Sequence, residues 1–164
     1  MPMSPFSERF PELAARETRS VTLRGRNDLP DGEYGFVELY CDEPQCDCRR
    51  VTIAVLRPHT GWKKFWATIS YGWEKLAFYQ KWSKSPEPLD PEEWNGPYLD
   101  PLCEQTKFSP ALLNLFHIVL ASPGYAERLK RHYRLFRTAV KQEYKKSSQE
   151  RSRLLSSGAA RSKG

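Results

Sequence analysis

The segment Tyr40–Val51 carries three cysteines within eight residues, and their spacing constrains this chain more than any other feature. Its sequence reads Tyr-Cys-Asp-Glu-Pro-Gln-Cys-Asp-Cys-Arg-Arg-Val, so Cys41, Cys46 and Cys48 form a Cys-x4-Cys-x-Cys pattern. Zinc favours thiolate ligands in tetrahedral arrays, and loops at the ends of strands commonly aim several sulfurs at one point. The pattern therefore predicts a site for one thiophilic metal ion, which we expect to be Zn2+.

Two other interpretations of these cysteines stay open. Cys46 and Cys48 are close enough in sequence to form a redox-active pair. Free cysteines also often serve as small buried hydrophobic residues, although the acidic loop 42–47 is a poor place to bury three of them. Arg49 and Arg50 follow directly and would offset part of the negative charge that several thiolates leave on a metal site.

A tetrahedral metal site needs a fourth ligand. His59 is unsuitable, because an extended strand at about 3.3 Å per residue would carry it far from the cysteine loop. Cys103 is the remaining thiol and reaches the site if its own loop folds over the cysteine loop. Asp42, Asp47 or a water molecule are the other candidates. The predicted ligand set is Cys41, Cys46, Cys48 and Cys103.

The segment 40–51 also resembles a signature, YCDxPxCDCRRV, of small uncharacterised bacterial proteins. The resemblance covers about twelve residues. It implies no activity, because none is assigned to those proteins.

Strand signals flank the cysteine loop on both sides. Gly35–Cys41 precedes it and Arg50–Leu56 follows it, and both runs are rich in β-branched and aromatic residues. Lys64–Tyr71 continues the pattern, and short connections between the runs favour an antiparallel meander. Ser20–Leu23 and Leu76–Gln80 are further candidate strands.

Helical signals dominate the C-terminal part. A short helix is expected at Pro11–Glu17, but the two longer ones follow the proline-rich loop 83–101. Ser109 is the expected N-cap of the first, which ends before Pro123. The second runs from about Tyr125 to Lys146, with an apolar residue every three or four positions.

The fold class that these signals predict is α+β: an antiparallel β-meander with a cysteine metal knuckle, two C-terminal helices and a disordered basic tail. Residues 1–146 would form a single globular domain. Residues 147–164 contain too little apolar surface to offset the entropy of ordering them, and we expect them to be disordered.

Positive charge is concentrated at the C-terminal end. Residues 126–164 hold twelve Lys and Arg against three Glu, a net of +9 in a chain of net charge +6, so residues 1–125 carry −3. The segment 62–84 also alternates aromatic residues with lysines, a pattern typical of surfaces that stack bases and neutralise phosphates. We predict nucleic-acid contacts for Trp66, Lys63, Lys64, Arg131 and Arg134. The alternatives are that the aromatic residues form the core, and that the basic helix contacts an acidic protein or only solvent.

The chain shows no signal-peptide pattern at its start, and its longest apolar stretch, Leu112–Ala121, is much shorter than the ~20 residues that cross a bilayer. We therefore expect a cytoplasmic protein without a membrane anchor, whose thiols stay reduced. His117 and His132 do not assemble a catalytic set. The expected function is a zinc-binding accessory protein with a structural metal site, with nucleic acid as a candidate partner. The alternative is a zinc-dependent hydrolase with three thiolate ligands and an open coordination position.

Overall fold

The computed structural model describes residues 2–59 and 64–161 and has the predicted α+β architecture. The strands are β1 (Met3–Pro5), β2 (Arg19–Leu23), β3 (Gly32–Cys41), β4 (Arg50–Leu56), β5 (Ala67–Gly72) and β6 (Gly96–Leu99). The helices are α1 (Phe6–Arg9), α2 (Pro11–Glu17), α3 (Leu76–Ser83), α4 (Pro91–Trp94), α5 (Ser109–Leu120) and α6 (Tyr125–Arg161).

All six strands belong to one antiparallel sheet. The order β1-β3-β4-β5-β6 contains the predicted meander, and β2 pairs with the same edge of β3 as β1 but nearer the start of that strand. Glu38 of β3 lies opposite Ile53 of β4, which in turn lies opposite Ile69 of β5. The cysteine loop is the connection from β3 to β4 and therefore lies at one end of the central strands.

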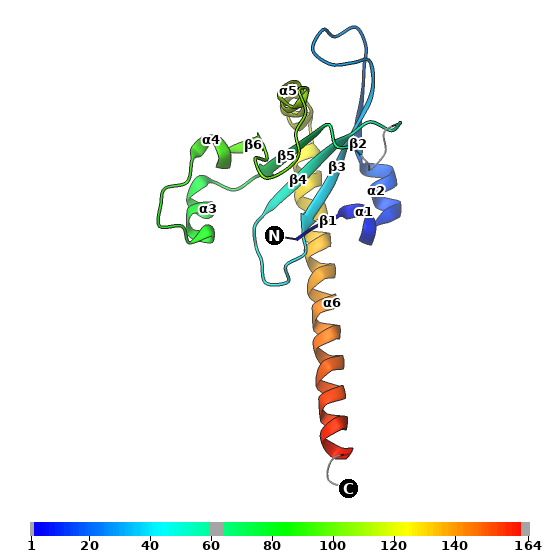
Figure 1. Ribbon diagram of the computed structural model, residues 1–164, viewed down its shortest axis with the longest axis vertical. Coiled ribbons are helices and arrows are strands. Elements are labelled where there is room, and N and C mark those ends of the chain that lie inside the picture. Colours follow the sequence, from blue (N-terminus) through cyan, green and yellow to red (C-terminus); the bar gives the residue numbers. More distant parts are fainter. Residues whose placement is uncertain (1, 60–63, 162–164) are drawn as a thin grey trace.

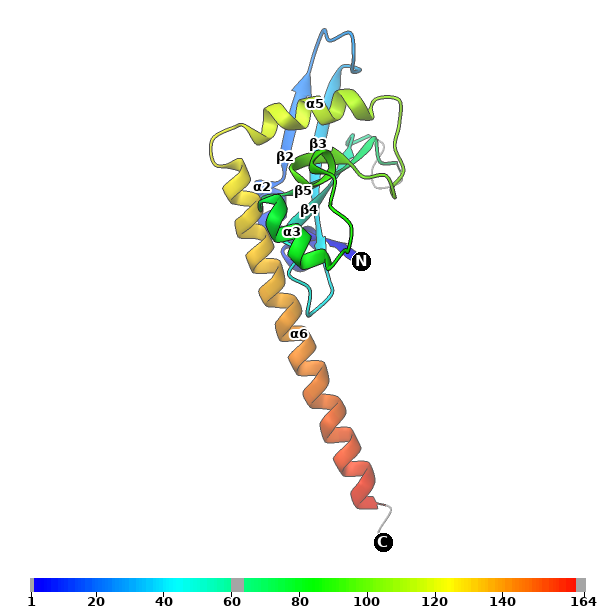
Figure 2. The same ribbon diagram turned by 90° about the vertical axis from the view of Figure 1, so that its left-hand side faces the viewer.

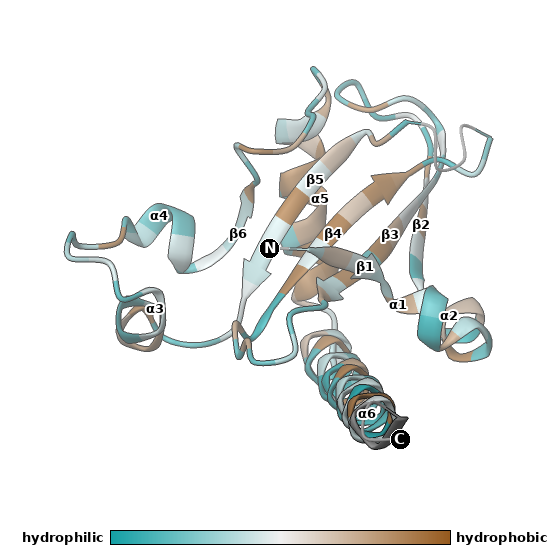
Figure 3. Cartoon of the chain, turned by 60° about the horizontal axis from the view of Figure 1, so that its bottom comes forward, coloured by the Kyte–Doolittle hydropathy of each residue, from teal (hydrophilic) through white to brown (hydrophobic). Residues whose placement is uncertain are grey.

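The main core lies between the sheet and the two long helices. In Figure 1, α5 and α6 lie behind the sheet, whereas α3 and α4 stand beside its β5–β6 edge. Phe36 of β3 is fully buried and its ring lies 5.7 Å from that of Phe116 in α5. Figure 3 shows hydrophobic residues concentrated along β3, β4 and β5. Because side chains alternate along a strand, one face of the sheet packs against α5 and α6, and the other face points away from these helices.

Three local expectations are wrong. The expected proline-rich loop 83–101 contains helix α4 and strand β6. Residues 76–80 belong to helix α3 and not to a strand, because Leu, Ala, Gln and Lys favour a helix and burial of Tyr79 anchors it. Ser109 is the first residue of α5 and not its N-cap. Its hydroxyl instead accepts a hydrogen bond from the Thr106 backbone N–H at 2.9 Å and donates one to the Trp66 carbonyl oxygen at 3.1 Å.

Helix α6 continues to Arg161, through the segment that the sequence analysis expects to be disordered. Figure 2 shows it leaving the sheet as a single long projection. Residues 147–158 are exposed or half-buried there. The segment carries strong helix formers such as Gln149, Glu150 and Leu154, so local propensity extends the helix without tertiary packing. Within the described residues, no helix has the combination of length and apolar character needed to span a membrane.

Candidate metal centre

A tight turn in the β3–β4 connection folds the chain back on itself. Cys41 is the last residue of β3, and the Cys46 backbone N–H donates a hydrogen bond to the Glu43 carbonyl oxygen at 3.1 Å. Pro44 occupies the second position of this turn, where its fixed φ angle is favourable. Arg49 then adopts a positive φ of 49° immediately before β4 begins. The turn brings the later cysteines back to the end of β3.

The three cysteines of the loop converge on one point. The Sγ atoms of Cys41, Cys46 and Cys48 all lie within 4.8 Å of one another. A tetrahedron with Zn–S bonds of about 2.3 Å has edges of about 3.8 Å, so a contraction of about 1 Å would bring the sulfurs to bonding distance. Cys41 and Cys48 are buried and Cys46 is half-buried. The three thiols are therefore positioned to hold a metal ion.

Backbone N–H groups support each sulfur in the same way. The amide of Glu43 hydrogen-bonds Cys41, that of Cys48 hydrogen-bonds Cys46, and that of Arg50 hydrogen-bonds Cys48. Each donor lies two residues after the cysteine that it contacts. Such N–H donors stabilise the thiolate form, which is the form that binds metal. The loop backbone is thus organised around three sulfur acceptors.

The thiols also share protons with one another. The hydrogen bond from Cys48 lowers the pKa of Cys41 to about 6, and the N–H of Glu43 adds to this effect against the opposing effect of burial. The reciprocal hydrogen bond with Cys41, together with burial, raises the pKa of Cys48. Burial and the nearby charge of Cys41 raise that of Cys46. The pKa of one thiol in the cluster is therefore lowered and the pKa values of the other two are raised, and a cation that bound all three sulfurs would displace their protons.

Arg137 of α6 holds the backbone of the cysteine loop through three hydrogen bonds. Its Nη1 donates to the Cys41 carbonyl oxygen at 2.9 Å, and its Nη2 donates to the carbonyl oxygens of Pro44 at 2.9 Å and Cys46 at 2.6 Å. The residue is only 6% exposed. Sequence reasoning missed this role because it counted Arg137 only as one of the twelve basic residues of 126–164. The one available signal was its position next to Phe136, in the apolar stripe of α6.

Tyr133 lies one turn earlier on α6 and holds the second half of the loop. Its hydroxyl accepts the Arg49 backbone N–H at 3.2 Å and donates to Asp47 at 3.2 Å. The Asp47 carboxylate also binds the Arg49 side chain, at 2.9 Å. Asp47, a candidate fourth ligand, is therefore engaged in other contacts.

Asp42, the other acidic candidate, is also held elsewhere. Its carboxylate forms an ion pair with Arg9 of α1 at 2.9 Å and accepts a hydrogen bond from the Ser4 hydroxyl. The carboxylate is therefore held by the N-terminal segment and not by the sulfur cluster.

The structure does not bring Cys103 to the cluster, in contrast to the predicted ligand set. Cys103 is exposed in the loop after β6, and its thiol hydrogen-bonds Asp100. The Asp100 backbone N–H in turn bonds the carbonyl oxygen of Thr68 at 3.0 Å. Thr68 lies four residues along β5 from the end beside the cysteine loop, a separation of about 13 Å. The loop that carries Cys103 does fold back onto the sheet, but it meets β5 too far from the cysteine loop for Cys103 to reach the sulfur cluster.

Trp66, the predicted stacking platform, lies against the start of α5. Its ring stacks on Phe108 with 5.0 Å between centroids and meets Tyr34 edge-on at 6.1 Å. Lys64 places its Nζ 5.8 Å from the Trp66 centroid, and Arg57 also lies over the ring at 5.0 Å. Lys63 falls outside the residues that the structure describes. Phe108 thus occupies one face of the ring, a contact that strand alternation alone does not reveal.

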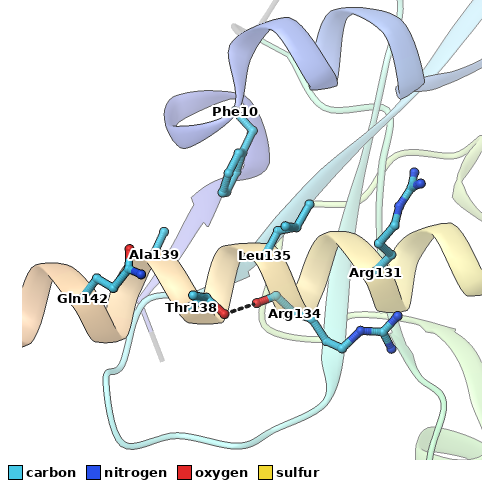
Figure 4. A pocket seen from close by; sticks show the side chains of 7 residues that line it. All are labelled: Phe10, Arg131, Arg134, Leu135, Thr138, Ala139 and Gln142. Carbon is cyan, nitrogen blue, oxygen red and sulfur yellow. Dashed lines mark hydrogen bonds between the residues drawn. The ribbon is translucent and has the colours of Figure 1, made fainter.

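Arg131 and Arg134 flank a shallow groove of about 360 Å³ between α6 and Phe10. Figure 4 shows their side chains leaving the helix in different directions, with Leu135 and Ala139 nearer the Phe10 ring. Arg131 forms an ion pair with Glu17, and Arg134 is exposed. Arg131 is therefore already paired with a carboxylate, and Arg134 is the exposed residue of the two.

The chain was compared with family models, curated proteins and solved structures. No protein-family model matches the chain, and neither a curated protein nor a solved structure matches it significantly. The functional assignment therefore rests on the arrangement of Cys41, Cys46 and Cys48 itself.

Proposed function

We propose that this chain is a zinc-binding accessory protein in which Cys41, Cys46 and Cys48 hold one Zn2+ as a structural clamp on the β3–β4 connection. One observation carries the proposal: three sulfurs lie within 4.8 Å of one another, and each accepts a backbone N–H from the residue two positions later. Zinc suits such a site because it is a borderline-soft ion that takes sulfur ligands in a tetrahedron.

The surroundings support a structural role. Buried Arg137 and Tyr133 already fix the loop backbone, so the bound ion would add its binding free energy to a connection between two central strands. Arg137 also places a positive charge near Cys41, which offsets part of the negative charge of three thiolates around a divalent ion.

Metal analysis of two matched variants tests the proposal. Protein purified under reducing conditions should contain one zinc per chain by mass spectrometry of the dissolved metal. Cys46→Ser should lose most of this zinc, whereas Cys103→Ser should retain it, because Cys103 lies outside the cluster. A folded wild-type protein that contains no zinc, and takes up none when it is supplied, would overturn the proposal.

Nucleic acid is the partner that we propose for the projecting part of α6. Its exposed cations are Lys141, Lys145, Lys146, Arg151 and Arg153. Phosphate contacts make binding fall with salt at a slope that reports their number. Fluorescence anisotropy with a single-stranded oligonucleotide should therefore show salt-dependent binding that a Lys141→Glu, Lys145→Glu, Lys146→Glu triple variant loses. If this variant bound the oligonucleotide as tightly as the wild-type protein does, α6 would not be part of the interface.

The second candidate function is a zinc-dependent hydrolase. It is favoured by the absence of a fourth ligand from the sulfur cluster among the described residues, and by Cys48 lining a large groove. An open coordination position beside a groove is typical of catalytic zinc. Cobalt-substituted protein distinguishes the two candidates. Its visible spectrum should change on addition of cyanide if the fourth position is open, and should stay constant if the site is closed.

A further inference from the structure

The sheet face opposite α5 and α6 forms one wall of a groove of about 800 Å³. Leu39, Thr52 and Ala54 contribute the strand side of this groove, and Trp82, Trp94 and Tyr98 come from α3, α4 and β6. Figure 1 shows α3 and α4 beside the β5–β6 edge and α5 and α6 behind the sheet, so the lining residues come from both the sheet and its edge. A groove with aromatic walls of this size is large enough for a small organic molecule.

Arg50, the first residue of β4, lines this groove and is only 5% exposed. Its Nη2 donates to the Ser70 hydroxyl at 3.1 Å. Its guanidinium carbon lies 4.6 Å from the ring centroid of Trp94, 5.0 Å from that of Tyr79 and 5.4 Å from that of Tyr98. Three aromatic rings therefore hold the guanidinium in place, which organises it in advance for a ligand.

The charge of Arg50 is not balanced within the groove floor. Among the described residues no carboxylate forms an ion pair with Arg50, whose polar contact is the Ser70 hydroxyl, and its buried Nη1 has no hydrogen-bond partner. The Thr68 hydroxyl, in the same groove, is also buried without a partner. An unpaired buried guanidinium is costly, and buried polar atoms normally have partners. Both residues line the groove, with Arg50 opposite Gly72 and Thr68 four residues along β5 from that position, so Arg50 marks the place of an anionic group.

We propose that this groove binds a small organic carboxylate, with its carboxylate on Arg50 and its apolar body against Leu39, Ala54 and Trp82. A guanidinium presents paired N–H donors that match the two oxygens of a carboxylate. Glu93, Asp100 and Glu104 also line the groove. No ion pair joins these carboxylates to Arg50, and they would repel each further negative charge on a ligand, so the groove favours a ligand with one carboxylate over a polyanion such as nucleic acid.

Two dyes that differ by one anionic group test this inference on the full chain. The probe 8-anilinonaphthalene-1-sulfonate carries a sulfonate in place of the carboxylate, and N-phenyl-1-naphthylamine is the same ring system without it. Arg50→Gln should weaken sulfonate-dye binding about tenfold or more and leave the uncharged dye within about twofold. Arg134→Gln is the matched control, because Arg134 lines the other groove, beside Phe10. It should leave both dyes unchanged.

A competition experiment on the wild-type protein removes any dependence on the folding of the Arg50 variant. 1-Naphthoate should displace the sulfonate dye, whereas the uncharged 1-naphthalenemethanol should not at the same concentration. Ala54→Trp, which fills the groove away from Arg50, should weaken both dyes. Equal displacement by the acid and the alcohol would overturn the inference, as would sulfonate-dye binding that survives Arg50→Gln. Zinc content measured on the same samples keeps this result separate from the metal site.

Discussion

Arg137 donates a hydrogen bond from Nη1 to the carbonyl oxygen of Cys41 at 2.9 Å and thereby joins the long C-terminal helix to the end of β3. The same guanidinium reaches two more carbonyl oxygens of the cysteine loop. The geometry of the metal centre therefore depends on a residue nearly a hundred positions away in the sequence. Because these donors act on the backbone and not on the sulfurs, the arginine positions ligands without being one of them.

Arg137→Met should weaken both the fold and the metal site. Loss of the guanidinium leaves carbonyl oxygens of the loop without their donor, at a cost of about 2–3 kcal/mol in the free energy of unfolding. Loss of such a supporting contact should also lower zinc affinity by about 10- to 100-fold. Urea unfolding and competition with a chromophoric chelator measure the two effects. The exposed Arg134→Met is the control, and equal zinc affinities of the two variants would contradict the positioning role.

A second prediction concerns His132, which is buried between two carboxylates. Its Nδ1 lies 2.7 Å from Glu38 and its Nε2 lies 2.7 Å from Glu17, while its ring stacks on Phe6 at 4.3 Å. His132→Phe keeps an aromatic ring but leaves buried Glu38 with the Tyr40 hydroxyl and without the imidazole, which should cost about 1–3 kcal/mol of stability. Urea unfolding measures this loss. Adding Glu38→Gln to the variant should recover part of it, and a loss below about 1 kcal/mol would show that the contact is unimportant.

Glu17 makes stability depend on pH. Burial acts to raise the pKa of Glu17, but the hydrogen bond with His132 and the charge of Arg131 outweigh it, so the pKa lies below its usual 4.5. A carboxyl with a lowered pKa stabilises the fold above its unfolded pKa, and this stabilisation is lost as pH falls through the folded value. The stability difference between wild type and Glu17→Gln should therefore be full at pH 7 and shrink below 4.5. A difference that stays constant down to about pH 3 would contradict this assignment.

Gly72 lies where a side chain would collide with the groove floor. A Cβ atom there would sit 2.7 Å from Cζ of Tyr79 and 2.8 Å from Nη1 of Arg50. The Tyr79 hydroxyl donates to the Arg49 carbonyl oxygen at 2.9 Å, so it has little freedom to move. Gly72→Ala should cost about 1–3 kcal/mol by thermal or urea unfolding. Gly158→Ala in α6, where an added Cβ would meet no atom within 4 Å apart from the adjoining helix backbone, should be neutral or slightly stabilising. Equal effects of the two substitutions would show that the floor is not tightly packed.

Local sequence signals were sufficient for strands β2 to β5 and for the position of the cysteine cluster, whereas the short strands β1 and β6 were not predicted. The predicted bounds of β4, Arg50–Leu56, and of α2, Pro11–Glu17, agree with the structure because alternation and helix propensity act over a few neighbouring residues. The cysteine loop follows directly from the two strands that flank it.

Long-range contacts could not be read in the same way. Nothing in the sequence near Arg137 shows that it turns inward to the cysteine loop, and nothing near Arg50 shows that aromatic residues of α3, α4 and β6 surround it. The path of the loop carrying Cys103 depends on pairing with β5, which spacing does not specify. For residues 147–161 the composition was misleading in another way. Few of them are apolar, which suggested disorder, but many are good helix formers and the segment is helical.

X-ray absorption at the zinc K edge of the purified protein tests the central claim most directly. We expect three sulfur neighbours at about 2.3 Å with one lighter ligand, and the same spectrum from Cys103→Ser, since Cys103 is outside the cluster. A first shell without sulfur, or a fourth sulfur that disappears in Cys103→Ser, would contradict a site built from Cys41, Cys46 and Cys48.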